Sequence, residues 1–442
     1  MSAWAIRAPP AASGAPDRVS PTPSLRQACA VWLKVGCLGF GGPAGQIALL
    51  HREVVEKRGW VDEDRFAHAL SFCMLLPGPE AQQLATWLGW RLHGVRGGLA
   101  AGLLFVLPGL FAMLGLSALY VVHGQARWAA PALLGLKAAV VALVLQALLK
   151  MAGRAARDRA GKVAAVLAFL ALSFTIAPFP LVILVAGLAG WFLGGRGAIP
   201  ASAEPPSPLK GAGRAALVCL AAWLAPVALA FVLAPRSALA QIGGVFSGLA
   251  VVSFGGAYAA LAYVGQVAGE LNWLTPNQML DGLGLAETTP GPLVLVFVFV
   301  GFVAAWRDAD PALAWPAAIA GGLMAAWATF APSFLWIFAG GPFVERLRTH
   351  ARAAAALSWV GAAVVGVIAS LALWFAVHLL FRSGDDVVWG PFRTTVPDLA
   401  SLDPAALGLV VLACGLTFAL RLPILALVAV MTLAGLACGA LF

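Results

Sequence analysis

Two motifs that contain glycine and proline lie inside apolar sequence, and each of them occurs twice. Phe-Gly-Gly-Pro at 40–43 returns as Phe-Gly-Gly-Ala at 254–257, and Pro-Gly-Pro at 77–79 returns at 290–292. Glycine and proline both interrupt regular helix, so each motif predicts a helix that stops and restarts. A helix that restarts there points free N–H groups and the positive end of its dipole at the break, which is the geometry that binds anions. The pattern therefore predicts an anion site made from broken helices.

Polar side chains that could serve such a site lie next to the motifs. Glu80, Gln82 and Gln83 follow the first Pro-Gly-Pro, whereas Glu287 comes before the second. An acid at membrane depth is costly, which makes it a candidate for function, and proton-coupled anion movement needs a protonatable carboxylate beside the anion. Glu80 could equally cap its own helix. The predicted substrate-binding residues are Lys34, Phe40, Gly41, Gly42, Pro43, Gln46, Pro77, Gly78, Pro79, Gln82, Gln83, Phe254, Gly255, Gly256, Thr288, Thr289, Pro290, Gly291 and Pro292; the predicted proton-coupling residues are Glu80 and Glu287, and no catalytic or metal-binding residue is predicted.

A simpler explanation of the glycines is close packing between helices, which small residues allow in membranes. Because the breaks occur at matched places in two halves, we favour a transport site over packing alone. Lys34 and Lys137 are single cations in apolar runs, and either could attract an anion. Lys137 lies near the end of its predicted helix, so we expect it to snorkel to the membrane interface, whereas Lys34 suits both roles equally.

The composition indicates a membrane protein. The 442 residues are 61% hydrophobic and 11% charged, whereas soluble domains are about 25% charged. The apolar stretches 163–193 and 405–442 are too long for one crossing and are interrupted near Pro178 and Pro423, so each predicts a tight hairpin. With a span of roughly 20 residues per crossing, we expect an all-α polytopic protein with about 13 transmembrane segments.

The motifs belong to a longer internal repeat. Pro108-Gly109 matches Pro332-Ser333, and the matches occur in the same order along both halves. The predicted organisation is a disordered cytoplasmic tail (1–24), a first repeat (25–193), a cytoplasmic linker (194–214), a linking transmembrane helix (215–234) and a second repeat (235–442).

Loop charges predict how the two halves are oriented. The loop 150–162 holds five basic residues and one Asp, whereas its counterpart 382–403 holds four Asp and two Arg. Basic loops stay in the cytoplasm, so matching loops lie on opposite sides and the repeats are inverted. This arrangement places the N-terminus in the cytoplasm and the C-terminus in the periplasm.

Several other classes of protein are not supported. The net charge of +9 is explained by basic loops rather than by nucleic-acid binding. The six cysteines stand singly in apolar sequence, which predicts neither disulfides nor a metal site. Metalloprotease, phosphate-binding-loop and nucleophile-elbow motifs do not occur, so we expect no enzyme activity, no cofactor and no ATP-driven pump.

The motifs resemble those of the chromate ion transporter family, in its long, two-domain bacterial form. The resemblance covers residues 25–442. It rests on Phe-Gly-Gly-Pro at 40–43, His-Arg-Glu at 51–53, Gly59-Trp60, Leu-Pro-Gly-Pro at 76–79 and Leu-Pro-Gly at 107–109. The second half departs from the pattern, because Ala257 replaces the proline and Leu293 stands at the position of Glu80. We therefore expect the two halves to contribute unequally.

The resemblance implies a secondary transporter of the bacterial inner membrane that exports chromate, is coupled to protons and confers chromate resistance. We add the hypothesis that it works by alternating access. Sulfate, a tetrahedral dianion of similar size, or another oxyanion is the alternative substrate, and a passive anion channel of the same fold is the alternative mechanism. An intramembrane enzyme that reduces chromate is a third hypothesis, which the missing cofactor motifs disfavour. The sequence does not determine the oligomeric state, and a homodimer is one alternative.

Overall fold

The computed structural model describes residues 23–74, 76–155, 158–194, 212–253, 257–349 and 351–441. Nearly all of the predicted tail (1–24) and most of the predicted linker (194–214) lie outside the described residues. So do Phe254, Gly255 and Gly256 of the second Phe-Gly-Gly motif.

Helices occur in the same order in both halves of the chain. The first half contains α1 (Leu25–Leu38), α2 (Gly42–His51) continued by the π-helical turn η1 (Arg52–Glu56), α3 (Glu63–Cys73), α4 (Glu80–His123), α5 (Ala129–Ala155), α6 (Arg159–Phe174) and α7 (Phe179–Leu193). α8 (Ala212–Leu233) connects the halves, at the place of the predicted linking helix. The second half contains α9 (Ala238–Val252), α10 (Ala257–Glu270), α11 (Pro276–Glu287), the 3-10 turn η2 (Leu293–Leu295), α12 (Val296–Asp308), the 3-10 turn η3 (Pro311–Leu313), α13 (Ala314–Thr349), α14 (Ala351–Leu380), the 3-10 turn η4 (Leu399–Ser401), α15 (Pro404–Cys414) continued by the π-helical turn η5 (Gly415–Ala419), and α16 (Ile424–Leu441).

The long helix α4 is two antiparallel arms rather than one rod. Its backbone leaves helical geometry at His93 and Gly94. Gly89 and Gly97 lie face to face across the resulting hairpin, where a methyl group on either would collide with the carbonyl of the other. The corresponding pair α12 and α13 packs in the same way, through Gly301 and Gly321.

The chain is a helical, multi-pass membrane protein. Among the described residues, the helices long and apolar enough to cross a bilayer are Glu80–His123, Ala129–Gly153, Gly213–Leu233, Pro311–Gly340 and Ala351–Leu380. Shorter apolar helices occupy Phe179–Leu193, Ala238–Val252, Pro404–Ala419 and Ile424–Ala440. The helices break near Pro178 and Pro423, at the two places where the sequence predicts turns. The total of about 13 crossings, based on roughly 20 residues each, stays a prediction.

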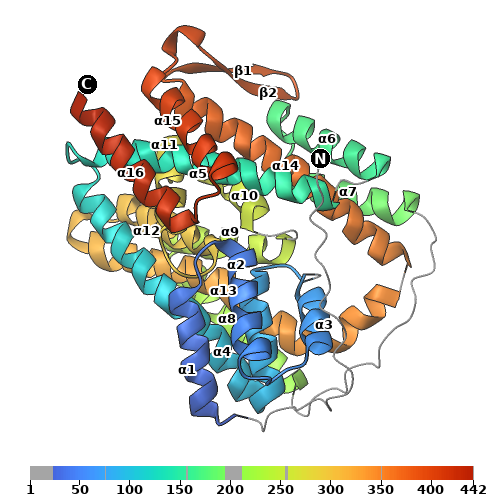
Figure 1. Cartoon of the computed structure of the whole chain (residues 1–442). Helices are drawn as coiled ribbons and strands as arrows, with labels where there is room; N and C mark the ends of the chain where they lie inside the picture. The colour runs from blue at the N-terminus through green and yellow to red at the C-terminus, as the bar shows by residue number, and fades with distance from the viewer. Residues whose placement is uncertain are drawn as a thin grey trace.

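The two halves exchange their peripheral helices (Figure 1). α5 of the first half packs against α15 and α16 of the second, while α14 of the second half packs against α6 and α7 of the first. Glycines allow these close approaches: Gly135 of α5 lies against Gly435 of α16, and Gly190 of α7 lies against Trp359 of α14. Each half therefore completes its packing only with helices from the other.

A β-hairpin interrupts the helical fold, and the sequence reading treats this stretch only as a loop. Strands β1 (Gly384–Trp389) and β2 (Phe392–Pro397) pair antiparallel at one end of the molecule (Figure 1). Gly390 adopts φ +58° in the two-residue turn, as a tight hairpin with glycine in its first central position requires. The prediction of a helical membrane fold is confirmed, and within the described residues this hairpin is the one addition of β-structure to it.

Candidate functional site

The motif glycines have the backbone conformations that break helices. Gly41 and Gly42 have φ of 91° and 69°, Gly78 has 114° and Gly291 has 104°. Values in this left-handed region are accessible to glycine and strained for other residues. The helices α2, α4 and η2–α12 each restart directly after such a break, so the predicted interruptions are present at every described motif.

Backbone hydrogen bonds join each Pro-Gly-Pro motif to the Phe-Gly-Gly region of the other half. The N–H of Gly78 donates to the carbonyl of Ser253 at 3.0 Å, and the N–H of Gly291 donates to the carbonyl of Gly39 at 3.0 Å. Ser253 and Gly39 each stand directly before a Phe-Gly-Gly motif. A reciprocal contact of this kind is what a twofold relation between two similar units produces. The described breaks therefore meet in one place.

Further contacts between the halves are reciprocal in the same way as these hydrogen bonds. Gly109 lies against the carbonyl of Pro290, so closely that a methyl group at Gly109 would collide with it. The residue that matches Gly109 in the second half, Ser333, places its Oγ beside Gly78. The first arm of each long hairpin thus starts at one Pro-Gly-Pro motif, and the second arm supports the motif of the other half.

Four helix starts surround a small cavity of about 30 Å³ at this meeting point. Pro43 represents the start of α2, Glu80 that of α4, Ala257 that of α10 and Leu293 that of η2. Each helix start carries a partial positive charge of about 0.5 of an elementary charge, so together they offer about two charges. That total matches a doubly charged anion when the carboxyl group of Glu80, which lines the same cavity, is neutral. The remaining lining residues are Gln46, Gly78, Pro79, Ala81, Phe246, Leu249, Ala250, Ser253, Ala260, Pro292, Val294, Phe297 and Thr329.

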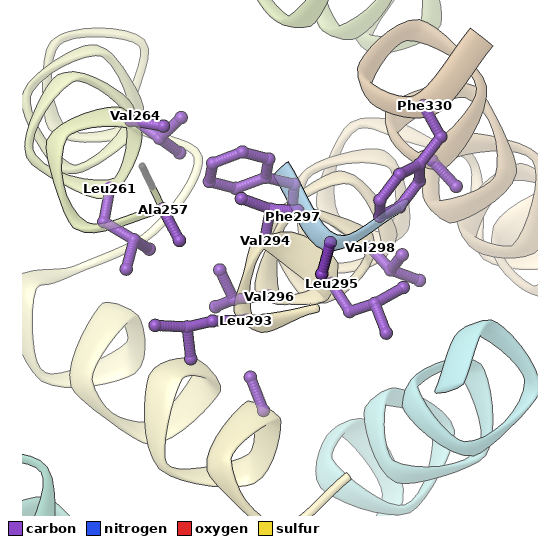
Figure 2. Close-up of a cluster of buried hydrophobic side chains, with 14 of the residues drawn as sticks. Ala257, Leu261, Val264, Leu293, Val294, Leu295, Val296, Phe297, Val298 and Phe330 are labelled. Atoms are coloured by element: carbon purple, nitrogen blue, oxygen red, sulfur yellow. The ribbon is translucent and has the colours of Figure 1, made fainter. Parts of the chain in front are cut away.

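The two sides of the cavity differ in chemistry. On the first-half side, Glu80 lines the cavity at the start of α4. On the second-half side, Leu293 starts η2 and packs in the cluster of buried hydrophobic side chains drawn in Figure 2, while the polar lining residues there are the neutral Ser253 and Thr329. Leu293, which replaces Glu80 in the repeat, is 3% exposed. A carboxylic acid therefore lines the cavity at the start of α4 and an apolar side chain at the start of η2, and the unequal contribution of the halves stays a prediction.

The predicted glutamine donors bind the backbone of the breaks. Gln46 Nε2 donates to the carbonyl of Gly39 at 3.0 Å, and Gln83 Nε2 donates to that of Pro77 at 2.7 Å. Gln82 Nε2 reaches the carbonyl of Phe330 at 3.4 Å. All three side chains are buried, and their Oε1 atoms have no hydrogen-bond partner within the described part of the chain. Of these three, only Gln46 lines the cavity.

The polar residues before the second Pro-Gly-Pro lie outside the cavity lining. The hydroxyls of Thr288 and Thr289 donate to the carbonyls of Leu285 and Ala286, within their own helix end. Glu287 is 6% exposed and accepts a hydrogen bond from the Tyr258 hydroxyl at 3.3 Å. The two predicted acids therefore lie in different environments. Glu80 lines the cavity, whereas Glu287 accepts a hydrogen bond from Tyr258 of α10.

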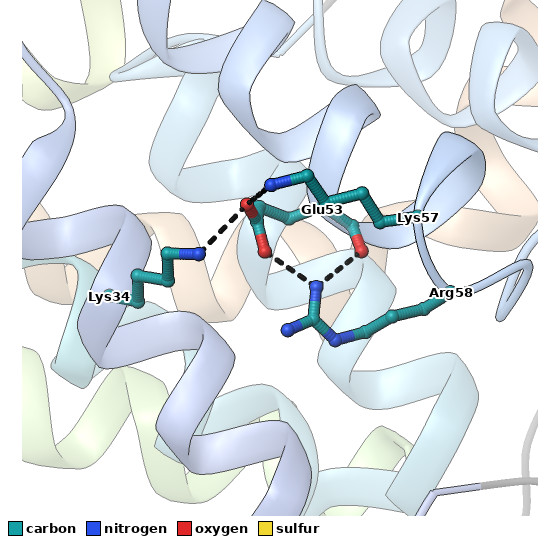
Figure 3. A network of polar contacts seen from close by, with 4 residues as sticks. All are labelled: Lys34, Glu53, Lys57 and Arg58. Atoms are coloured by element: carbon teal, nitrogen blue, oxygen red, sulfur yellow. Dashed lines mark hydrogen bonds and ion pairs between the residues drawn. The ribbon is translucent and has the colours of Figure 1, made fainter.

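Lys34 belongs to a different cluster, which the sequence reading missed (Figure 3). Its Nζ lies 3.1 Å from Oε1 of Glu53, a carboxylate with no exposed surface, and Lys57 lies 3.0 Å from the same atom. Arg58 binds the other carboxylate oxygen. Burial raises the pKa of Glu53, but the hydrogen bonds from Lys57, Arg58 and Lys34 outweigh it and lower that pKa from 4.5 to about 2. The cluster keeps two uncompensated positive charges, and Lys34 is absent from the cavity lining.

Lys137 also has a partner that the sequence reading missed. Its Nζ lies 3.3 Å from Oδ1 of Asp281, and the two side chains are 13% and 8% exposed. The hydroxyl of Tyr120 donates to Oδ2 of Asp281 at 2.9 Å. The expected snorkelling is therefore replaced by a buried ion pair that joins α5 to α11. An acid inside an apolar segment is the signal that could have pointed to Asp281.

Comparison with known proteins agrees with this architecture. The family model of chromate transporters matches residues 26–191 and 240–438, which lie in the two halves. The chromate transport protein of Pseudomonas aeruginosa is 33% identical over 370 residues, covering 80% of this chain and 81% of that protein. The chromate transport protein of Cupriavidus metallidurans is 28% identical over 357 residues, covering 79% and 82%.

An uncharacterised transporter of Methanocaldococcus jannaschii is 24% identical over 350 residues, covering 78% of this chain and 83% of that protein. No solved structure matches. Two matched regions, extensive similarity to named relatives and the paired helix breaks lead to the same conclusion. The chain belongs to the chromate transporter family.

Proposed function

We propose that this protein is a secondary transporter that carries chromate, or a similar tetrahedral oxyanion such as sulfate, at the cavity between the four helix starts. The observation that carries the proposal is the convergence of those starts on one cavity. They offer a charge of about two, which suits a dianion without placing a free cation in the membrane. The names of the relatives from Pseudomonas and Cupriavidus support chromate as the substrate.

The size of the cavity favours a carrier over an open channel. A volume of about 30 Å³ holds about two water molecules, whereas a tetrahedral oxyanion has five heavy atoms. The site must therefore widen to admit its substrate, and a closed site that opens is the behaviour expected of alternating access. We propose that the repeats are inverted, with the N-terminus in the cytoplasm and the C-terminus in the periplasm. We also propose that the two halves rock about the crossed breaks, by which we mean the helix breaks that bind each other across the two halves.

Coupling to protons is proposed to run through Glu80. An ionised Glu80 at the cavity repels a bound dianion, whereas a protonated Glu80 does not, so proton binding and anion binding are linked. Release of the proton then promotes release of the anion on the same side of the membrane, so one proton and one dianion leave together with a net charge of −1. The membrane potential, which is positive outside, drives that charge in the export direction. Transport in the export direction would lower cytoplasmic chromate and give resistance. Glu287, bound to Tyr258, is proposed as a second proton carrier.

The test is chromate uptake into everted membrane vesicles, with sulfate as competitor. The proposal expects uptake that depends on the proton gradient and stops when an ionophore collapses it. In Glu80→Gln, uptake should lose its dependence on the gradient and fall at least tenfold, while the matched control Asp310→Asn, an exposed acid of a loop, should behave as wild type. Passive equilibration of chromate that continues with the ionophore would instead establish a channel. Full gradient-driven uptake by Glu80→Gln would remove Glu80 from the mechanism.

A further inference from the structure

A second and much larger cavity lies beneath the β-hairpin. Its volume is about 440 Å³, and it is bordered by the α6–α7 junction, one face of α10, α14 and the hairpin. Polar groups line it on every side, among them Gln266 of α10, His378 of α14 and Arg393 of β2. The Oγ of Ser173, another lining residue, is buried without a hydrogen-bond partner in the described residues. On the measure of about 15 Å³ per water molecule, a space of this size accommodates about 30 water molecules, and one of them would satisfy such a group.

The hairpin is fixed over this cavity at both of its ends. At the tip, the N–H of Ile176 donates to the carbonyl of Pro391 at 3.1 Å, which ties the turn to the α6–α7 junction. At the base, Arg382 and Asp403 form an ion pair at 2.8 Å. Among the hairpin residues that line the cavity are Asp386 and Arg393, which pair at 3.3 Å. The roof is therefore an ordered, charged surface rather than an apolar one that would suit lipid.

One face of α10 leads from this cavity toward Glu287. Positions on that face repeat at intervals of three or four residues, as one side of a helix does. Ala262, Gly265, Gln266 and Gly269 line the cavity, and Tyr258, one turn deeper, continues the same face. The Tyr258 hydroxyl donates to Glu287. At 1.5 Å per residue, the helix face from Glu270 to Tyr258 is roughly 18 Å long.

The opposite face of α10 belongs to the anion cavity. Ala257 and Ala260 line that cavity, and Ala259, Ala260 and Leu261 are 0–1% exposed. α10 thus stands between the two cavities. A proton that moves along one face and an anion that binds at the other would meet only through the helix and its Tyr258–Glu287 contact.

We propose that the cavity under the hairpin is a water-filled vestibule that delivers protons to Glu287 through Tyr258. A proton passes from a hydronium ion in the vestibule, which becomes water, along the face of α10 to the Tyr258 oxygen, one turn beyond the lining residue Ala262. The hydroxyl proton of Tyr258 passes at the same time to Oε1 of Glu287. One O–H bond of Tyr258 breaks and another forms, so tyrosine is unchanged and Glu287 becomes neutral. The charged and titratable groups at the vestibule are Glu270, His378, Asp386 and Arg393. The delivery of protons to Glu287 rests on the proposed function, because that function makes Glu287 a proton carrier. The presence of water in the vestibule is independent of the proposed function.

Thiol accessibility tests the vestibule without any measurement of transport. In a variant whose six cysteines are replaced, Ala262→Cys is exposed to a charged, membrane-impermeant methanethiosulfonate reagent. Ala259→Cys, on the buried face of the same helix, is the matched control. A hydrated vestibule predicts that Ala262→Cys reacts at least tenfold faster. Equal rates would mean that lipid or protein fills the space, and would overturn the proposal. If the cysteine-free protein does not fold, oxidative footprinting of native Trp374, which lines the vestibule, against buried Phe375 of the same helix gives the same comparison.

Tyrosine substitution tests the delivery of protons. Tyr258→Phe removes the hydroxyl that donates to Glu287. The matched control is Tyr263→Phe, because Tyr263 lies in the same helix, α10, and its ring packs on Phe179 of α7. Chromate-driven proton movement in proteoliposomes should slow about tenfold in Tyr258→Phe and stay unchanged in Tyr263→Phe. An unchanged rate in Tyr258→Phe would refute the delivery role. Chromate binding to the purified protein separates the two proposals. If Ala262→Cys reacts with the thiol reagent but the protein does not bind chromate, the proposed transport site is refuted and the hydrated vestibule is not.

Discussion

The ion pair between Lys137 and Asp281 gives a sharp prediction about stability. The two groups lie 3.3 Å apart, and both side chains are at least 87% buried. Removal of one partner leaves the other charged and buried, which costs about 3–5 kcal/mol. Asp281→Asn keeps a partner for Tyr120 and should cost about 3 kcal/mol, a change of roughly 150-fold in the unfolding equilibrium constant. Lys137→Met should cost about 4 kcal/mol, since its apolar side chain leaves Asp281 with Tyr120 as its partner.

The double variant decides whether the pair itself is responsible. Removal of both charges together should cost only about 1 kcal/mol, several kcal/mol less than the sum of the single changes. The assay is reversible unfolding in mixed micelles, with Lys150→Met, an exposed lysine of the same helix, as control. Single variants within about 0.5 kcal/mol of wild type, or a double variant whose cost equals the sum, would refute the view that this contact holds α5 against α11.

Two further predictions concern the break region and the basic cluster. Gly109→Val should collide with the carbonyl of Pro290, cost about 1–3 kcal/mol and abolish chromate uptake, whereas Gly115→Val, with open space around it, should do neither; equal uptake by the two variants would contradict the crossed-break arrangement. Because the pKa of Glu53 is lowered from 4.5 to about 2 in the fold, its contribution to stability is complete above pH 4.5 and is lost as the pH falls toward 2. Thermal unfolding between pH 5 and 3 should therefore depend less steeply on pH in Glu53→Gln than in wild type, and equal slopes would show that Glu53 is not held ionised.

The helix breaks could be predicted because their cause is local. Glycine and proline restrict or release the backbone wherever they occur, so the interruptions at Gly41, Gly78 and Gly291 follow from the residues themselves. A helix was predicted at 215–234 and α8 occupies Ala212–Leu233, because a long apolar run of this kind forms a helix in a membrane; its role as a link between two repeats stays a prediction. The doubling of the chain was visible for the same reason, as the same local signals occur twice.

The polar partnerships could not be predicted, because they depend on which helices become neighbours. Lys137 and Asp281 are far apart in the sequence, and only the packing of α5 on α11 brings them together. Glu53 lies in a stretch of mixed charge that reads as a solvated loop, yet its carboxylate is fully buried. That the glutamines bind an anion stays a prediction, but the donation of Gln46 and Gln83 to the carbonyls of Gly39 and Pro77 could not be predicted from the sequence. The β-hairpin was missed because its two strands are short and exposed, and their apolar side chains do not pack into the core.

The exchange of peripheral helices has a consequence for how the protein is made. α5 ends at Ala155, but its packing partners α15 and α16 begin only at Pro404. At about 5–20 residues per second, translation takes roughly 12–50 s to supply them. During that interval α5 must wait in the bilayer with its glycine-lined surface against lipid or an insertion chaperone. Truncations from the C-terminal end should thus expose the first half to quality-control proteases, even though every residue of that half has already been inserted.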